Sequence, residues 1–336
     1  MSQRQWIVRG KPLGRAIEPS DHELVEAPVR EPEAGELLVR VEWLGIDPAQ
    51  KSWIEQDVGY MAQAGADQVQ PGYGAGTVLR SAHPDYAVGD RVMGLLGWRE
   101  RATVAVSDVE KLPDGVAPEL ALACLGNTGR TAYLALTKVG RPKPGDTLLI
   151  SAAAGATGSL AGQIGKLAGC RVVGIAGGPQ KCAMLVEQLG FDDAIDYKAG
   201  NVRRRLKESC PDGIDIFFDN VGGELLDQAL ARLAKGARVV ICGGIARYNA
   251  DPRDPAQMPP GPRNYFNLVF AGATMGGFLI FDEQTDWPKA DARLIPWLKE
   301  QRIKPLLDIA EGLENAPAAL ARLFAGGNVG KQLVRL

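Results

Sequence analysis

The chain has few of the residues on which metal and nucleophilic chemistry depend. Its 336 residues include two histidines, His22 and His83, and five cysteines. A catalytic zinc ion takes about three protein ligands, and a structural zinc takes about four closely spaced ones. Neither histidine stands in a Gly-His-Glu motif, and we expect both to be solvated loop residues. No Gly-x-Ser-x-Gly nucleophile elbow is present. The sequence therefore predicts no metal site and disfavours zinc-dependent alcohol oxidation.

Charge excess and long apolar runs are missing as well. The 38 basic residues balance 40 acidic ones, so nothing favours binding to nucleic acid or to a membrane surface. No apolar run is long enough to cross a bilayer, and the first residues lack the apolar core of a signal peptide. The cysteines stand singly, which indicates reduced thiols. We expect a cytoplasmic protein. The five are Cys124, Cys170, Cys182, Cys210 and Cys242.

The pattern of apolar residues changes along the chain and indicates two domains. Up to about residue 120, short apolar runs alternate with Pro-Gly and Gly-Asp turns, which is typical of a compact β-barrel. From Leu120 onward, apolar strands alternate with amphipathic helices, which predicts a doubly wound parallel sheet and an α/β fold. The segment from Asp291 ends in a strand, 331–336, that we expect to return to the first domain. The five predicted strands of the second domain are 147–151, 171–176, 194–197, 214–220 and 238–242.

The stretch from Thr147 to Ser159 carries the strongest functional signal. A buried strand leads into a turn with small residues at Ala152, Gly155 and Gly158, and a helical pattern follows. Small residues let backbone N–H groups approach a pyrophosphate, and the helix N-terminus attracts its negative charge. A second strand at the expected distance strengthens the pattern. The alternative is a helix–strand crossing without a ligand, and dinucleotide binding is the better interpretation.

The end of that second strand favours NADP over NAD. An NAD site usually presents Asp or Glu there, which accepts hydrogen bonds from the ribose. This chain reads Ala176-Gly-Gly-Pro-Gln-Lys181 and has no acid. Two glycines leave room for a 2′-phosphate, and Lys181 can bring a cation to it. Lys181 could equally be a solvated residue in the first turn of a helix that Pro179 begins.

Motifs along the whole chain resemble the medium-chain dehydrogenase/reductase superfamily in its zinc-independent branch. Within that branch the chain is most similar to the NADP-dependent alkenal/one reductases, the group that contains prostaglandin and curcumin reductases. The matching motifs are Ile46-Asp-Pro48, Gly72-Tyr-Gly-Ala-Gly76, Gly89-Asp-Arg-Val92, Gly129-Arg-Thr-Ala-Tyr133, Ala152-Ala-Ala-Gly-Ala-Thr-Gly-Ser159, Asp196-Tyr-Lys198, Phe218-Asp-Asn-Val-Gly-Gly223, Ile241-Cys-Gly-Gly-Ile-Ala-Arg-Tyr-Asn249 and Gly327-Asn-Val-Gly-Lys331.

The resemblance implies two domains and a set of NADP(H)-binding residues. Residues 1–122 and 296–336 would form a GroES-like barrel, and residues 123–295 a Rossmann domain. Lys181 and Tyr197 would contact the 2′-phosphate, and Asn328 the nicotinamide side. Tyr197 and Asn220 also have simpler interpretations, as a strand-end tyrosine and a turn-forming asparagine. The remaining expected contacts are Ala154, Gly155, Ala156, Thr157 and Gly158 at the pyrophosphate, and Asn220, Cys242 and Gly243 at strand ends.

Hydride transfer without a metal needs an acceptor that is already electrophilic, such as an alkene conjugated to a carbonyl. Hydride would reach the β-carbon, and a donor would stabilise the charge that develops on the carbonyl oxygen. Tyr248 matches the family tyrosine near that oxygen, and a phenol with a pKa of about 10 keeps its proton at neutral pH. Tyr248 could instead only order its loop. We therefore predict an NADPH-dependent ene reductase acting on a small-molecule enone or enal.

Departures from the family pattern fall at the expected substrate pocket. Ala49 and Lys51 stand where the family commonly has Tyr and Arg, and Asn127, Thr128 and Arg130 make a second segment more polar. We expect a roomier pocket that accepts polar or acidic enones. The simpler interpretation of Arg130 is packing on a helix surface.

Three functions stay open on the sequence alone. The first is the ene reductase, the second is a quinone oxidoreductase of the same superfamily, and the third is a cofactor-binding protein with little turnover. The family also implies a homodimer, which we expect to form through edge pairing of a late strand, 268–275.

Overall fold

The computed structural model describes residues 2–56 and 58–336, which divide into two compact units. Unit 1 comprises Met1–Gly126 and Leu307–Leu336, and unit 2 comprises Asn127–Leu306. The sequence placed the second domain limit after residue 295, which falls inside the continuous helix α9 (Trp287–Lys299). Because that helix belongs whole to unit 2, the unit extends past it to Leu306. In the described residues no helix has both the length and the apolarity to span a membrane.

Unit 1 is built on a mostly antiparallel sheet in the order β14-β15-β3-β4-β5-β7, with β6 also paired to β3. The long strand β3 is its centre, and Leu37, Val39 and Leu44 of that strand are fully buried. The strands are β3 (Glu36–Ile46), β4 (Tyr73–Ser81), β5 (Arg91–Leu95), β6 (Arg101–Ala105), β7 (Val109–Lys111), β14 (Leu307–Glu311) and β15 (Lys331–Arg335), and a separate ribbon pairs β1 (Ser2–Val8) with β2 (His22–Pro28).

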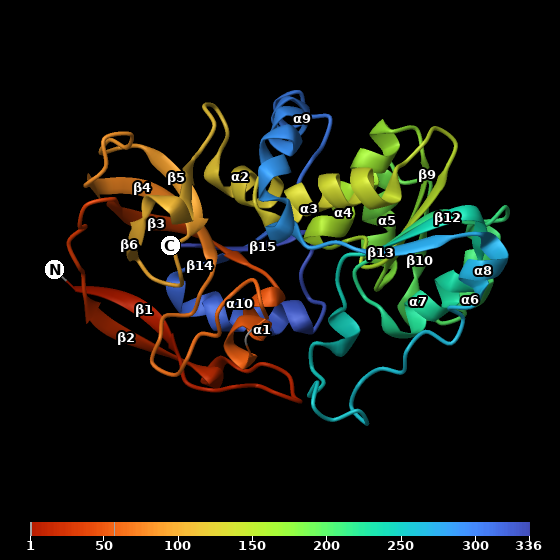
Figure 1. The fold of residues 1–336 in the computed structure, drawn as a ribbon, viewed down its shortest axis with the longest axis horizontal. Helices are drawn as coiled ribbons and strands as arrows, with labels where there is room; N and C mark the ends of the chain where they lie inside the picture. Colours follow the sequence, from red (N-terminus) through yellow and green to blue (C-terminus); the bar gives the residue numbers. More distant parts are fainter. Residues whose placement is uncertain (1, 57) are drawn as a thin grey trace. The chain divides into compact units, whose positions relative to one another are not determined.

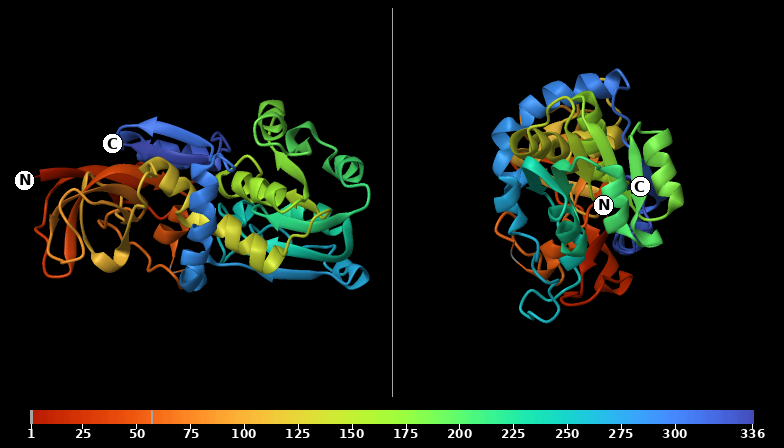
Figure 2. Two further views of the ribbon diagram at one scale, coloured as in Figure 1. Left: turned by 90° about the horizontal axis from the view of Figure 1, so that it is seen from above. Right: turned by 90° about the vertical axis from the view of Figure 1, so that its right-hand side faces the viewer.

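The return of the C-terminal segment to the first domain is confirmed. Strand β15 runs antiparallel to β3, with Gln332 opposite Ile46, and β14 pairs with β15 in parallel. Figures 1 and 2 show these blue strands beside the red and orange strands of the N-terminal part. Helices α1 (Ala49–Glu55), α2 (Pro118–Cys124) and α10 (Ala316–Phe324) belong to this GroES-like unit.

The expectation that His22 is a solvated loop residue is wrong. His22 opens β2 and is only 6% exposed. Its Nε2 lies 2.8 Å from Oε1 of Gln70, and its ring stacks on Trp98 with centroids 5.1 Å apart. A single histidine among charged neighbours gives no sign of burial in the sequence, because Gln70 and Trp98, which contact it, come from distant segments of the chain.

Unit 2 contains the predicted doubly wound sheet. Six parallel strands lie in the order β10-β9-β8-β11-β12-β13, so the direction of winding reverses between β8 and β11. The five strands expected from the sequence are all present, and β13 adds a sixth at the edge. They are β8 (Thr147–Ile150), β9 (Arg171–Ala176), β10 (Asp193–Asp196), β11 (Ile214–Asp219), β12 (Leu233–Ile241) and β13 (Thr274–Gly277).

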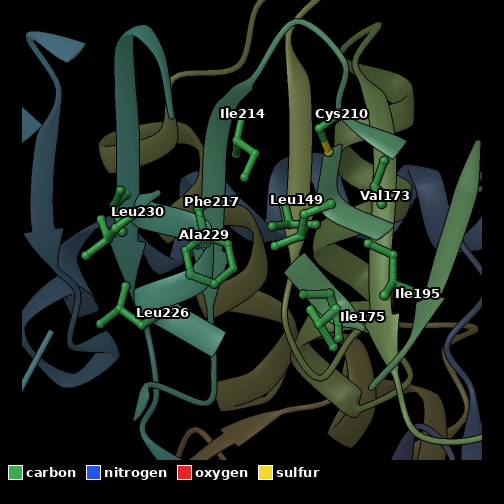
Figure 3. Close-up of a cluster of buried hydrophobic side chains, with 13 residues drawn as sticks. Leu149, Val173, Ile175, Ile195, Cys210, Ile214, Phe217, Leu226, Ala229 and Leu230 are labelled. Atoms are coloured by element: carbon green, nitrogen blue, oxygen red, sulfur yellow. The ribbon is translucent and has the colours of Figure 1, made fainter. Parts of the chain in front are cut away.

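Side chains alternate between the two faces of this sheet. On one face, Leu149 and Phe217 join a buried cluster with Leu206 of α6 (Val202–Ser209) and Ala229 of α7 (Gly223–Leu230), part of which Figure 3 shows. On the other face, Leu148 lies against α4 (Ala156–Leu167), and a Cβ on Gly165 of that helix would come within 2.4 Å of its side chain. The remaining helices are α3 (Asn127–Ala135), α5 (Pro179–Glu187), α8 (Asn267–Ala271) and α9.

The expected late strand over 268–275 is wrong in most of its length. Residues Asn267–Ala271 form helix α8, Gly272 follows in the left-handed region with φ of 60°, and only Thr274–Gly277 is extended. The apolar run Leu-Val-Phe-Ala reads as a strand, but Gly272 provides a helix C-cap that permits the short helix.

Candidate cofactor-binding site

All six strands of unit 2 end at the same edge of the sheet, because they are parallel. In open α/β sheets, ligands bind outside these carboxyl ends, at the point where the strand order reverses. Here that point lies between β8 and β11. The loops that follow β8, β9, β10, β11 and β12 carry most of the residues expected to bind the cofactor.

The turn after β8 forms an anion cradle. Ala152 adopts the left-handed conformation with φ of 48°, and the Gly155 N–H donates to its carbonyl at 2.9 Å. Gly155 is the N-cap of α4, and no described side chain caps this helix. The first N–H groups of a helix have no intrahelical acceptor, so those of Ala156, Thr157 and Gly158 suit a phosphate.

Gly158 lets this turn and its helix approach each other. A Cβ there would lie 2.5 Å from the Ala152 oxygen and 2.9 Å from the Ala153 Cα. The residues predicted to bind pyrophosphate therefore lie together on one compact backbone segment, and the cradle fits a dinucleotide. They are Ala154, Gly155, Ala156, Thr157 and Gly158.

The ends of β9 and β10 meet at Gly177. A Cβ on Gly177 would lie 2.9 Å from Cε1 and 3.0 Å from the hydroxyl of Tyr197, and 3.0 Å from Cε of Lys198. An Asp or Glu at this position would have to displace the Tyr197 ring and the Lys198 stem, so these two side chains oppose the acid that serves an NAD ribose. Two of the basic or phenolic groups at this end, Lys181 and Tyr197, were predicted from the sequence. Lys198, which is exposed, was missed, although it directly follows Tyr197.

Asp196 carries a carboxylate close to Gly177, and its Oδ1 atom accepts hydrogen bonds from the backbone. It accepts hydrogen bonds from the N–H of Gly178 at 2.8 Å and of Lys198 at 2.9 Å. The first bond holds the loop after β9, and the second caps the turn Tyr197–Ala199. The carboxylate therefore orients the segment that carries Tyr197 and Lys198.

A buried network joins the ends of β8 and β11. The Ser151 hydroxyl donates to Oδ1 of Asp219 at 2.7 Å, and both residues are fully buried. Asn220 donates its backbone N–H to the Ser151 hydroxyl and its side-chain amide to the Ser151 carbonyl, both at 2.8 Å. Sequence reasoning missed Ser151 and Asp219. The available signal was a polar residue at the end of each of two neighbouring apolar strands.

Cys242 and Gly243 follow β12 at the same edge, where their N–H groups donate to the Asp219 carbonyl at 2.9 and 3.1 Å. Burial, with Asp219 nearby, raises the pKa of the Cys242 thiol to about 12. Tyr248 lies a few residues further on, at the end of the turn Ile245–Arg247, and is half-buried. Asn220, Cys242 and Gly243 are thus brought together.

Arg130 of the expected substrate pocket lies in a different setting from the one predicted. It is 2% exposed in α3, paired with Asp291 of α9, and its guanidinium lies 4.5 Å from the centre of the Trp287 ring. Asn127, the first residue of α3, is half-buried. Because Asp291 neutralises the Arg130 charge, the expected preference for acidic enones loses this support.

Ala49, Lys51 and Asn328 belong to unit 1. Lys51 is fully buried in α1 and forms an ion pair with Glu55 one turn later, while Ala49 is half-buried at the start of that helix. Asn328 lies in the loop before β15, and its side-chain amide donates to the Gly330 carbonyl at 2.9 Å. Across residues 2–56 and 58–336, no three His, Cys, Asp or Glu side chains gather in a way that could hold a metal ion.

Comparisons with known proteins cover the whole chain. Residues 4–112 match the family model described as the N-terminal domain of oxidoreductase, and residues 156–295 match the one described as zinc-binding dehydrogenase. The NADPH-dependent curcumin reductase of Escherichia coli K12 is 37% identical over 340 residues, which cover 99% of this chain and 96% of that protein. The NADP-dependent 2-alkenal reductase of Nicotiana tabacum is 37% identical over 341 residues, covering 99% and 97%.

A solved structure agrees with these relatives. The crystal structure of CurA in complex with NADPH from Vibrio vulnificus matches with a TM-score of 0.90 and 37% identity, over 99% of this chain and 98% of that one. The chain therefore belongs to the medium-chain dehydrogenase/reductase superfamily, in the branch of NADP-dependent reductases that includes curcumin reductase and 2-alkenal reductase.

Proposed function

We propose that this protein is an NADPH-dependent ene reductase that reduces the carbon–carbon double bond of an α,β-unsaturated ketone or aldehyde. The full-length similarity to curcumin and alkenal reductases supports the reaction. Gly177 is the observation that carries the cofactor preference, since it stands where an NAD-type acid would be and lies against the Tyr197 ring and the Lys198 stem. When bound, NADPH supplies the hydride that the β-carbon of the substrate accepts.

The residues of the sheet edge divide the work of binding. We propose that the backbone from Ala154 to Gly158 holds the pyrophosphate and that Lys181, Tyr197 and Lys198 hold the 2′-phosphate. Asn220, Cys242 and Gly243 line the continuation of the site along the sheet edge. We propose that Asn328 contacts the cofactor, as the family resemblance implies. On the same ground we propose that Ala49, Lys51 and Asn127 line the substrate pocket.

Tyr248 is the proposed hydrogen-bond donor to the carbonyl oxygen of the substrate. Reduction of a conjugated alkene places negative charge on the carbonyl oxygen, and a donor aimed at that oxygen lowers the barrier. Tyr248 follows the strand-end turn that begins at Cys242, on the same edge as the cofactor loops. Its phenol would donate a hydrogen bond to the enolate oxygen, and the α-carbon would then take up a proton from solvent water.

The test is the initial rate of NADPH and NADH oxidation with an enone, its saturated ketone and a simple quinone. We expect turnover of the enone with NADPH and formation of the saturated ketone. Turnover of the quinone alone would instead assign a quinone oxidoreductase. NADPH binding without turnover of any acceptor would assign a non-catalytic binding protein.

We also propose a homodimer and a cytoplasmic location. Strand β13 lies at the edge of its sheet, and the neighbouring Val269 and Phe270 are 65% and 67% exposed. A second copy would pair with this edge and cover the apolar side chains. Light scattering measures the mass, and Phe270→Asp should yield a monomer. The five cysteines are all thiols, which favours a reducing compartment.

A further inference from the structure

We propose that Ser151 and Asp219 are a positioning pair that couples the phosphate-binding turn after β8 to the loops after β11 and β12. Neither residue is a predicted cofactor contact. The inference rests on the proposed function, because it assumes that a dinucleotide lies along this edge of the sheet. Ser151 and Asp219 would fix the position of the adenosine end of that dinucleotide relative to its nicotinamide end.

Each group in the pair bridges two loops. The Ser151 hydroxyl donates to Asp219 and accepts from the Asn220 backbone N–H. Both bonds join the end of β8 to the end of the neighbouring strand β11. The Asp219 carboxylate also accepts from the N–H of Val221 at 3.0 Å and of Gly222 at 3.0 Å. These bonds fold the loop after β11 back over the strand end.

The loop after β12 is joined to the same centre. The carbonyl of Asp219 accepts from Cys242 and Gly243, the Asn220 carbonyl accepts from Ile245 at 3.3 Å, and the Val221 carbonyl from Ala246 at 3.1 Å. Three loops thus depend on Asp219 at the end of β11, on the two residues that follow it, and on the hydroxyl of Ser151 just after β8. Loss of that hydroxyl would leave the buried Asp219 carboxylate and the part-buried Asn220 N–H short of a partner, which the loops can relieve by moving.

A positioning role predicts a selective effect on binding. Adenosine 2′,5′-bisphosphate carries the adenosine end of the cofactor but lacks the nicotinamide end, whereas NADP+ must span the coupled loops. A variant that loosens the coupling should weaken NADP+ much more than the bisphosphate. A loss of general stability would lower the melting temperature and leave the ratio of the two dissociation constants unchanged.

The variants are Ser151→Ala and Asp219→Asn, and Ser151→Thr restores the hydroxyl. A matched control is Ser209→Ala, because the Ser209 hydroxyl also donates to a carboxylate, that of Asp193 at 2.6 Å, and is also buried. Asp193 begins β10, so this second serine–aspartate pair lies at the amino ends of the strands. Calorimetry gives both dissociation constants for each variant.

We expect Ser151→Ala and Asp219→Asn to raise the dissociation constant of NADP+ about tenfold and that of the bisphosphate less than twofold. Ser151→Thr should recover most of the NADP+ affinity, and Ser209→Ala should change neither constant. NADPH deuterated at both C4 positions should show a larger isotope effect on kcat in Ser151→Ala. Equal shifts of both constants, or no shift in a folded variant, would overturn the inference.

If neither variant folds, hydrogen exchange on the wild-type protein tests the same inference. The probe is ADP-ribose 2′-phosphate, which would place its pyrophosphate in the turn after β8 and carries no nicotinamide. The inference requires it to slow exchange of the Val221–Gly223 and Cys242–Ile245 amides, and unchanged exchange there would contradict it. Absence of NADP+ binding to the wild-type protein would instead overturn the proposed function.

Discussion

Arg130 and Asp291 form a two-point ion pair between α3 and α9. Nε of Arg130 donates to Oδ1 at 2.9 Å and Nη2 donates to Oδ2 at 2.6 Å. The guanidinium also faces the Trp287 ring, so hydrogen bonds and a cation–π contact hold this buried charge in place. The pair holds the first helix of unit 2 to the helix that ends it.

Arg130→Ala should therefore destabilise the protein rather than change its substrate range. Removing Arg130 leaves the Asp291 carboxylate without its partner, and because that carboxylate is partly exposed we expect a cost of about 1–3 kcal/mol. The double variant Arg130→Met with Asp291→Leu should recover much of that loss. Thermal unfolding measures the stability, and the relative kcat/KM on charged and neutral enones should stay unchanged. A selective loss on charged enones would restore the expected role of Arg130 in the pocket.

Lys198→Ala should lower the preference for NADPH over NADH. The Lys198 stem crosses Gly177 and brings an exposed ammonium to the end of β9. We expect kcat/KM for NADPH to fall about tenfold, since a charged hydrogen bond to a phosphate is lost, while the value for NADH stays within twofold. Lys207→Ala is the control, because Lys207 is an exposed lysine in the last turn of α6. An equal fall with both cofactors would show that Lys198 does not read the 2′-phosphate.

Tyr248→Phe should slow hydride transfer without weakening the binding of NADPH. Loss of one donor to a developing oxyanion typically costs about 10²–10³ in kcat. The dissociation constant of NADPH should change by less than about twofold, as the phenol is proposed to act on the substrate oxygen. A loss of NADPH affinity at unchanged kcat would mean that Tyr248 only orders its loop.

His22 should make stability fall with acid. Burial lowers the pKa of His22 below the usual 6.5, although the bond to Gln70 and the charge of Asp21 oppose this. Below about pH 6.5 the unfolded chain binds the proton first, so stability is lost as the pH falls from 6.5 through the lower folded pKa. Melting temperatures between pH 7 and pH 5 should therefore fall, and His22→Gln should reduce that slope. A slope unchanged by the substitution would exclude His22 as its source.

Cys242 should resist alkylation although it lies at the cofactor edge. A thiol with a pKa of about 12 has about one thiolate in ten thousand molecules at pH 8, and the thiolate is the reactive form. Iodoacetamide at pH 8 should leave Cys242 unmodified in the folded protein and modify it after denaturation. Peptide mass spectrometry distinguishes the two, and rapid native labelling of Cys242 would contradict the raised pKa of its thiol.

The sequence by itself determined the parts of this protein that depend on local pattern. Short apolar runs separated by helices specified the five parallel strands of unit 2, and Ala152, Gly155 and Gly158 marked the turn after β8 because only small residues permit that backbone. The missing acid after β9 gave the cofactor preference. The sequence could not reveal that the side chains of Tyr197 and Lys198 lie against Gly177, because a helix separates β9 from β10 along the chain.

Only the tertiary structure decided what depends on contacts between distant segments. His22 is buried by Gln70 and Trp98, Arg130 is neutralised by Asp291, and Ser151 meets Asp219 because β8 and β11 pair across the reversal of the sheet. A side chain's charge and environment are set by its neighbours in space, which the order of residues does not record. The sequence therefore identified the kind of site, and folding decided which polar groups are available to act in it.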